Sequence, residues 1–109
     1  MKKCNRCKEL AEEYAEDHNG KVARDKKITL RIENKIWSDF YYGQGWKYHN
    51  GGFANVEELG VACVGNRYHV FAYVEHGIQD CGSGHAVTYS DDVEFEMNEK
   101  FEVIDNVRE

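Results

Sequence analysis

The sequence predicts an α+β fold in which an N-terminal helix packs on a bent, mainly antiparallel sheet of five to seven strands. Two patterns predict it: apolar residues recur with a helical period near the N-terminus, and from residue 26 onward they recur with a period of two. The sheet is either an open layer or a partly closed barrel. Because 109 residues suffice for one core, we expect a single domain, with the helix at about 5–18 and a β-rich part at 26–107.

The predicted helix at about 5–18 has one apolar stripe. Leu10 and Tyr14 lie four residues apart on that stripe, and acidic residues cover most of the remaining surface. Asn19 and Gly20 follow, and both residue types tolerate the left-handed backbone conformation that ends many helices. We therefore expect the helix to stop near residue 18.

Two strands are predicted to come next. In the segment 26–33, Ile28, Leu30 and Ile32 alternate with polar residues, which is typical of a half-buried strand. A turn at Asn34-Lys35 would lead into a second strand at 36–42. This second segment is rich in aromatic residues, and its spacing is less regular.

Two hairpins are predicted in the middle of the chain. The first joins Trp46–Tyr48 to Phe53–Val56 through residues 49–52, whose Asn-Gly step suits a tight turn. The second joins 61–64 to 67–75 through a Gly-Asn turn. Both faces of this second hairpin are apolar, so we expect it to be the central pair of the sheet.

The C-terminal part is predicted to be a meander. A glycine-containing loop at 76–84 precedes strands at 85–90, 93–97 and 101–106, which are separated by polar turn residues. The inward positions of all these strands define a predicted core. It consists of Leu30, Ile32, Val61, Val70, Ala72, Val74, Val87, Phe95 and Val103.

Charge is distributed unevenly along the chain. Residues 1–35 hold ten Lys/Arg and seven Asp/Glu, a net charge of +3, whereas residues 75–109 hold two and ten, a net charge of −8. The total of −6 argues against a nucleic-acid-binding protein, whose affinity comes largely from cations that neutralise phosphates. A partner with a basic surface fits this charge better.

Carboxylates near the C-terminus are candidate partner-binding groups. Glu94 and Glu96 alternate with apolar residues on a predicted strand, so both should point away from the core, about 6.7 Å apart. Such a row is comparable to the charges of a nucleic-acid backbone, and the alternative is an ordinary solvated face. The predicted partner-binding set is Asp91, Asp92, Glu94, Glu96, Glu99 and Glu102, joined by Trp46 and Tyr48 from the aromatic segment 37–53.

The cysteines raise two further hypotheses. Cys4 and Cys7 have the spacing of half a zinc site, and His76 and Cys81 could complete it, with Cys63 and His85 as other donors. Partly buried thiols that bind no metal are the alternative. The Cys4-x-x-Cys7 pair also has thioredoxin-type spacing, but it lacks the preceding strand of that motif. The loop Asp80–His85 combines a thiol, a hydroxyl, a carboxylate and an imidazole, as nucleophilic hydrolases do, without guaranteeing that they meet.

These observations leave two classes of function open. No run of about 20 apolar residues is present, so we expect a cytoplasmic protein without membrane contact. In size, acidity and lack of catalytic motifs it resembles the accessory proteins of phages and mobile elements, including anti-CRISPR and other anti-defence inhibitors, which would place it in the host cytoplasm. We therefore expect an inhibitor that occupies a basic nucleic-acid-binding surface of a partner protein. The alternative is a small zinc-stabilised or Cys/His-loop enzyme or ligand-binding protein.

The zinc hypothesis predicts a measurable metal content. If Cys4 and Cys7 hold an ion with His76 and Cys81, the purified chain should retain close to one zinc per molecule after extensive dialysis, because such sites bind tightly. Elemental analysis measures this directly. A zinc content far below one per chain would leave thiols that bind no metal.

Overall fold

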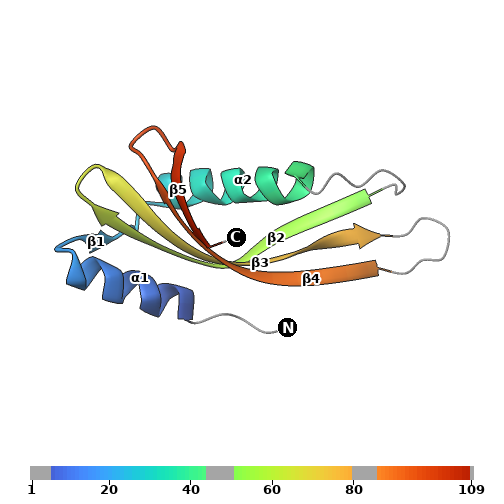
Figure 1. Cartoon of the computed structure of the whole chain (residues 1–109), viewed down its shortest axis with the longest axis horizontal. Helices are drawn as coiled ribbons and strands as arrows, with labels where there is room; N and C mark the ends of the chain where they lie inside the picture. The colour runs from blue at the N-terminus through green and yellow to red at the C-terminus, as the bar shows by residue number, and fades with distance from the viewer. Residues whose placement is uncertain (1–5, 44–50, 80–85, 109) are drawn as a thin grey trace.

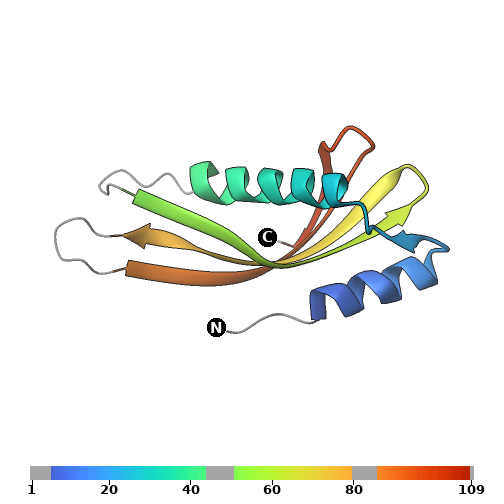
Figure 2. The same cartoon turned by 180° about the vertical axis from the view of Figure 1, so that it is seen from behind.

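A computed structural model describes residues 6–43, 51–79 and 86–108. It contains an N-terminal helix packed on an open five-stranded antiparallel sheet with strand order β1-β2-β3-β4-β5, which confirms the predicted fold class (Figure 1). A second helix lies on the opposite side of the sheet (Figure 2). The elements are α1 (Arg6–Asp17), β1 (Lys21–Val22), α2 (Lys26–Gly43), β2 (Gly51–Val64), β3 (Arg67–Gln79), β4 (Ala86–Met97) and β5 (Val103–Arg108).

The first helix ends as predicted. Asn19 adopts a positive φ of 56°, and the Gly20 N–H donates a hydrogen bond to the Ala15 carbonyl at 2.7 Å, which satisfies one of the last free carbonyls of the helix. The chain then enters β1, which pairs Lys21 with Cys63 and Val22 with Ala62.

The predicted strands at 26–33 and 36–42 are wrong, because both segments belong to the helix α2. Asp25 caps this helix: its carboxylate accepts a hydrogen bond from the Lys27 N–H at 2.8 Å. Ile28, Ile32 and Ile36 are four residues apart, so they form one helical stripe, and Leu30, the remaining apolar residue of the alternation, lies off that stripe.

The central hairpin is confirmed, and its strands are longer than predicted. Val61 lies opposite Val70, and Gly65, at φ 58°, occupies the turn where a left-handed backbone favours glycine. The strand β3 runs on to Gln79, through the start of the predicted loop at 76–84. Residues 44–50 lie outside the described residues, so the hairpin predicted at 46–56 is represented only by the beginning of β2.

The strands predicted at 85–90 and 93–97 are a single strand, β4, so Asp91-Asp92 makes no turn. Asp91 lies opposite Val74 and Asp92 opposite Tyr73, and the ladder with β3 continues through both residues. The next turn is formed by Asn98, whose side-chain oxygen accepts hydrogen bonds from the backbone N–H groups of Lys100 and Glu102. As a result β5 begins at Val103, two residues later than predicted.

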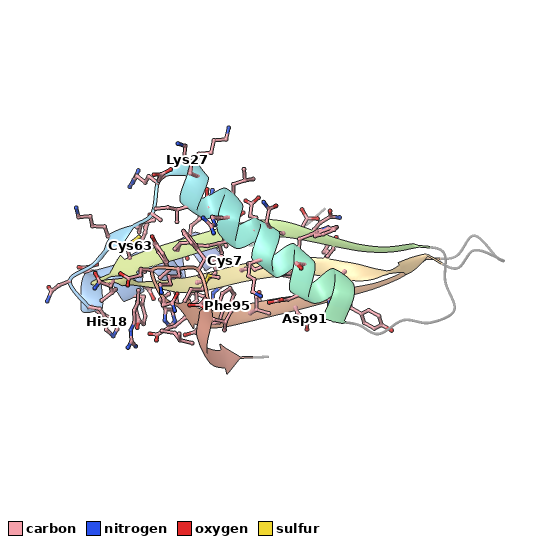
Figure 3. All side chains as sticks on the ribbon, turned by 90° about the horizontal axis from the view of Figure 1, so that it is seen from above. Cys7, His18, Lys27, Cys63, Asp91 and Phe95 are labelled. Atoms are coloured by element: carbon pink, nitrogen blue, oxygen red, sulfur yellow. The ribbon has the colours of Figure 1, made fainter. Side chains whose placement is uncertain are left out.

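The larger core lies between the sheet and α2, which crosses the strands obliquely (Figure 3). Of the predicted core residues, Ile32, Val61, Val70, Ala72, Val74 and Phe95 are buried, and Val103 is partly buried against them. Leu30 is 53% exposed, because the helix turns it to the outer side of α2. The side chain of Val87 lies outside the described residues.

Two aspartate substitutions test this core and the helical assignment of α2. Val70→Asp should lower the free energy of unfolding by more than about 4 kcal/mol, because it places an unpaired charge in a fully buried position. Leu30→Asp should stay within about 1 kcal/mol of the wild type, because residue 30 is exposed on a helix. Chemical denaturation followed by circular dichroism measures both. If Leu30→Asp unfolds the protein, residue 30 is a core position and the helical assignment fails.

Candidate functional site

The face of the sheet that carries α1 contains a cluster of polar side chains around His69. The helix packs mainly on β2 and β3 through Cys7, Ala11 and Ala15, which are small enough for a close approach. At Gly60 on β2, an added Cβ would lie only 2.0 Å from the Cys7 carbonyl oxygen. The backbones of helix and strand are therefore nearly in contact, and α1 packs closely on the sheet at this point.

Three aromatic rings stack between α1 and β3. The ring of Tyr14 lies between the imidazoles of His18 and His69, with centroid separations of 3.9 and 3.8 Å. His69 is buried beneath this stack, and Phe71 meets Tyr14 at an angle. The stack extends the helix–sheet contact from the small apolar residues of α1 toward β4.

Carboxylates from β4 surround the buried imidazole. His69 Nε2 lies 2.7 Å from Glu94 Oε2, and His69 Nδ1 lies 3.4 Å from Glu96 Oε1. A neutral imidazole carries only one N–H, so both contacts become hydrogen bonds only when the ring is doubly protonated. Glu96 Oε2 also lies 3.5 Å from Arg67 Nη1, and Glu96 Oε1 accepts a hydrogen bond from the Tyr14 hydroxyl at 3.4 Å. Burial and the neighbouring Glu96 carboxylate raise the pKa of Tyr14.

The structure separates the predicted partner-binding carboxylates. Asp92, Glu94 and Glu96 follow one another at two-residue steps on the α1 side of β4, as the alternation predicts. The side chains of Glu94 and Glu96 are only 27% and 20% exposed, however, because they contact His69 and its neighbours.

The other members of the predicted set lie elsewhere. Asp91 belongs to the α2 side of β4, and its carboxylate lies 2.5 Å from Nε2 of the buried His76. Glu99 and Glu102 are exposed near the turn between β4 and β5, where Glu102 accepts a hydrogen bond from the Asn98 side chain. Trp46 and Tyr48 lie outside the described residues.

The helix α1 supplies carboxylates that the net charge of residues 1–35 conceals. Arg6–Asp17 holds two basic and five acidic residues, a net charge of −3, whereas residues 18–35 hold six and two, a net charge of +4. The total of +3 for residues 1–35 concealed this difference. All five carboxylates are exposed, and they are Glu9, Glu12, Glu13, Glu16 and Asp17.

The sheet separates these charges in space. The acidic α1 and the basic first half of α2 lie on opposite sides of it (Figures 1 and 2). The exposed Asp92 and the half-buried Glu75 are on the α1 side, as their alternation with Val74 and Val93 indicates. We call this surface the acidic face; it comprises the five α1 carboxylates together with Glu75 and Asp92. Of the acidic residues at 75–109, Glu75 and Asp92 thus join the α1 carboxylates on one side of the sheet, whereas Asp91 lies on the other.

The four predicted zinc ligands are not assembled by the described residues. Cys7 is buried against Phe71 on the α1 side, whereas His76 continues the alternation of Val74 on the α2 side. Cys4 and Cys81 lie outside the described residues, as does the loop Asp80–His85, so the zinc site stays a prediction. Where the structure describes the chain, no group of three or more His, Cys, Asp or Glu side chains is placed to hold a metal ion. Burial raises the pKa of the half-buried Cys63 thiol.

Comparison with protein-family models, characterised proteins and solved structures finds no match to this chain. Neither helix in the described part of the chain has the length and apolar character needed to cross a membrane. A function must therefore be argued from the chemistry of the surface itself.

The polar cluster predicts an unusual tyrosine titration. Because burial and Glu96 favour the neutral phenol, Tyr14 should titrate above the ordinary value of about 10, and Glu96→Gln should lower its pKa. The folded state holds this proton more tightly than the unfolded chain does. Its contribution to stability is therefore complete below pH 10 and is lost as the pH rises through the raised pKa.

Ultraviolet absorbance titration of the wild type minus that of Tyr14→Phe isolates this residue among the seven tyrosines. The same subtraction in the Glu96→Gln background gives the effect of the carboxylate. A Tyr14 titration that is identical in the two backgrounds would show that Glu96 does not act on the hydroxyl.

Proposed function

We propose that this protein acts by binding, and that its acidic face docks on a basic, nucleic-acid-binding surface of a partner protein. Bound there, it would exclude nucleic acid and act as an inhibitor, in the manner of the anti-defence proteins of phages and mobile elements. The observation that carries the proposal is the segregation of charge across the sheet, with α1, Glu75 and Asp92 on one side and the basic start of α2 on the other.

The spacing of the α1 carboxylates supports a docking role. Glu9, Glu13 and Glu16 follow one another at intervals of four and three residues, so they form one exposed row along the helix. One exposed ion pair contributes at most about 1 kcal/mol. A row of charges that meets a complementary field adds faster association and discrimination among partners.

Glu94 and Glu96 have a different role in this proposal. They already contact His69, Arg67 and Tyr14, so they hold α1 in place and are less available to a partner. Replacing them with lysine would put cations beside His69 and Arg67 and would disturb the fold. Substitutions that test docking should therefore be made at the exposed carboxylates of α1.

Binding from a cell lysate tests the proposal. Protein captured at low salt should be enriched in nucleic-acid-binding proteins, because their basic surfaces match the acidic face. Capture should fall at high salt, which screens exposed charges, and an added oligonucleotide should compete with it. If the amount of captured protein changes neither at high salt nor with added oligonucleotide, the proposal is contradicted.

Paired charge reversals then locate the docking surface. Glu13→Lys/Glu16→Lys should weaken binding to the purified partner by about tenfold or more, since two favourable charge interactions become repulsive. The matched control Lys26→Glu/Lys27→Glu, on the α2 side, should change the affinity far less. Both doubles should keep the wild-type melting temperature, because all four side chains are exposed. If the control strengthens binding as much as the first double weakens it, net charge alone governs binding and the acidic face has no special role.

A further inference from the structure

The outer edge of β2 is covered over only a small part of its length. The strand β1 pairs with Ala62 and Cys63, and the Ala23 N–H donates a hydrogen bond to the Val61 carbonyl at 2.8 Å. Among the described residues, no strand pairs with the rest of this edge, toward Gly51. An uncovered strand edge presents backbone donors and acceptors that another extended chain can pair with.

Two adjoining cavities, of about 290 and 240 Å³, follow the β2 edge between α1 and α2, and the second extends to Val22, Ala23 and Val61, where the edge is already covered. Both are lined by Lys8 from α1, Thr29 from α2 and Leu59 from β2, so they form one groove. Each alone lies just below the range of about 300–1,000 Å³ that is usual for ligand-binding pockets, and their combined volume lies within it. The groove continues the line of β1 along the sheet, where a further strand would lie.

A buried carboxylate faces into this groove. A β-bulge falls between Val56 and Glu58, and bulges of this kind redirect side chains at strand edges. The side chain of Glu58 is only 7% exposed, and its Oε1 accepts no hydrogen bond from the described residues. The described cation near it is Lys8, whose Nζ lies 3.3 Å away on a side chain that is 70% exposed. A buried carboxylate with so little compensation favours a further positively charged donor.

We infer that this groove binds an extended segment of the partner by strand addition, and that Glu58 binds an arginine side chain of that segment. The charge of the groove agrees, since four carboxylates (Glu12, Glu33, Glu57 and Glu58) line it against two cations (Lys8 and Arg24). Backbone pairing with β2 would supply affinity, and Glu58 would supply selectivity for a cation. That the segment belongs to the partner rests on the proposed function; the binding of a basic extended peptide does not.

A capped five-residue peptide with an arginine between two valines tests the inference by NMR titration of the isotopically labelled protein. Its addition should shift the amide signals of Val56–Gly60 and of Thr29. The same peptide with citrulline in place of arginine should bind about tenfold more weakly or worse, because a charge-assisted hydrogen bond is lost. N-methylation of the peptide backbone should also abolish binding, because it blocks strand pairing.

Two substitutions of opposite sign complete the test. Glu58→Gln should weaken binding of the arginine peptide about tenfold and remove its advantage over the citrulline peptide. Lys8→Met should strengthen binding, because it removes the cation that competes for Glu58. Glu57→Gln is the matched control, because it removes the same charge from the residue next to Glu58. It should weaken binding of the arginine peptide much less than Glu58→Gln does. If Glu58→Gln fails to fold, the change in peptide affinity of Lys8→Met still tests the role of Glu58.

Several results would overturn the inference: no peptide binding, equal affinity for arginine and citrulline, or shifts centred on Glu13 and Glu16. Failure here would leave the charge-reversal test on α1 intact, since neither Glu13 nor Glu16 lines the groove, although Glu12 of the acidic face does. Conversely, if a charge reversal on α1 leaves the affinity for the partner unchanged, the proposed function is contradicted. Binding of the peptide to β2 would be unaffected by that result.

Discussion

The pairing of β3 with β2 on one side and β4 on the other is the constraint on which the rest of the structure depends. Successive β3 side chains point to opposite faces, so Val70, Ala72 and Val74 pack under α2 while His69 and Phe71 pack under α1. A shift of one residue in this register would exchange the two sets. The imidazole would then enter the larger apolar core, and valines would replace it under the Tyr14 ring.

The same register accounts for the charge pattern. Where β4 lies beside β3, Val93 and Phe95 complete the apolar core on the α2 side, and Glu94 and Glu96 reach His69 on the other side. The core and the polar cluster therefore come from alternate residues of the same two strands. The acidic helix α1 covers the polar cluster, and the basic part of α2 lies beyond the apolar core. This arrangement gives a small chain two chemically different sides.

Much of the sheet could be predicted from the sequence, because apolar residues recur with a period of two along its strands. The hairpin at Gly65 and the buried positions of β3 result from local turn chemistry and alternation. The helix α2 was missed because Ile28, Leu30 and Ile32 also fit a strand, and the decisive signals were the Asp25 cap and the more distant Ile36. The break expected at Asp91-Asp92 failed for a related reason, since pairing with β3 overrides weak local turn preferences.

The candidate sites were harder to predict because they depend on contacts between distant segments. Glu94 and Glu96 were placed on the correct face, but nothing in their neighbourhood indicates that His69 and Tyr14 would bury them. Glu58 could not be recognised at all. It lies beside a bulge in β2, and the cation near it, Lys8, belongs to a separate helix. The acidity of α1 was visible in the sequence, but it was averaged with the basic segment that follows.

The close approach of α1 to the sheet has a consequence for motion. Cys7, Ala11 and Ala15 permit that approach, but such small side chains remove little apolar area from water. Beyond these small residues, α1 is held in place by Leu10, by Tyr14 and by the charges around His69, whereas α2 is held by Ile32 and Ile36 in the main core. Local opening of α1 costs less than global unfolding, so its amide protons should exchange with solvent before those of β3. A protein organised in this way can release its acidic helix for a moment while its sheet stays folded.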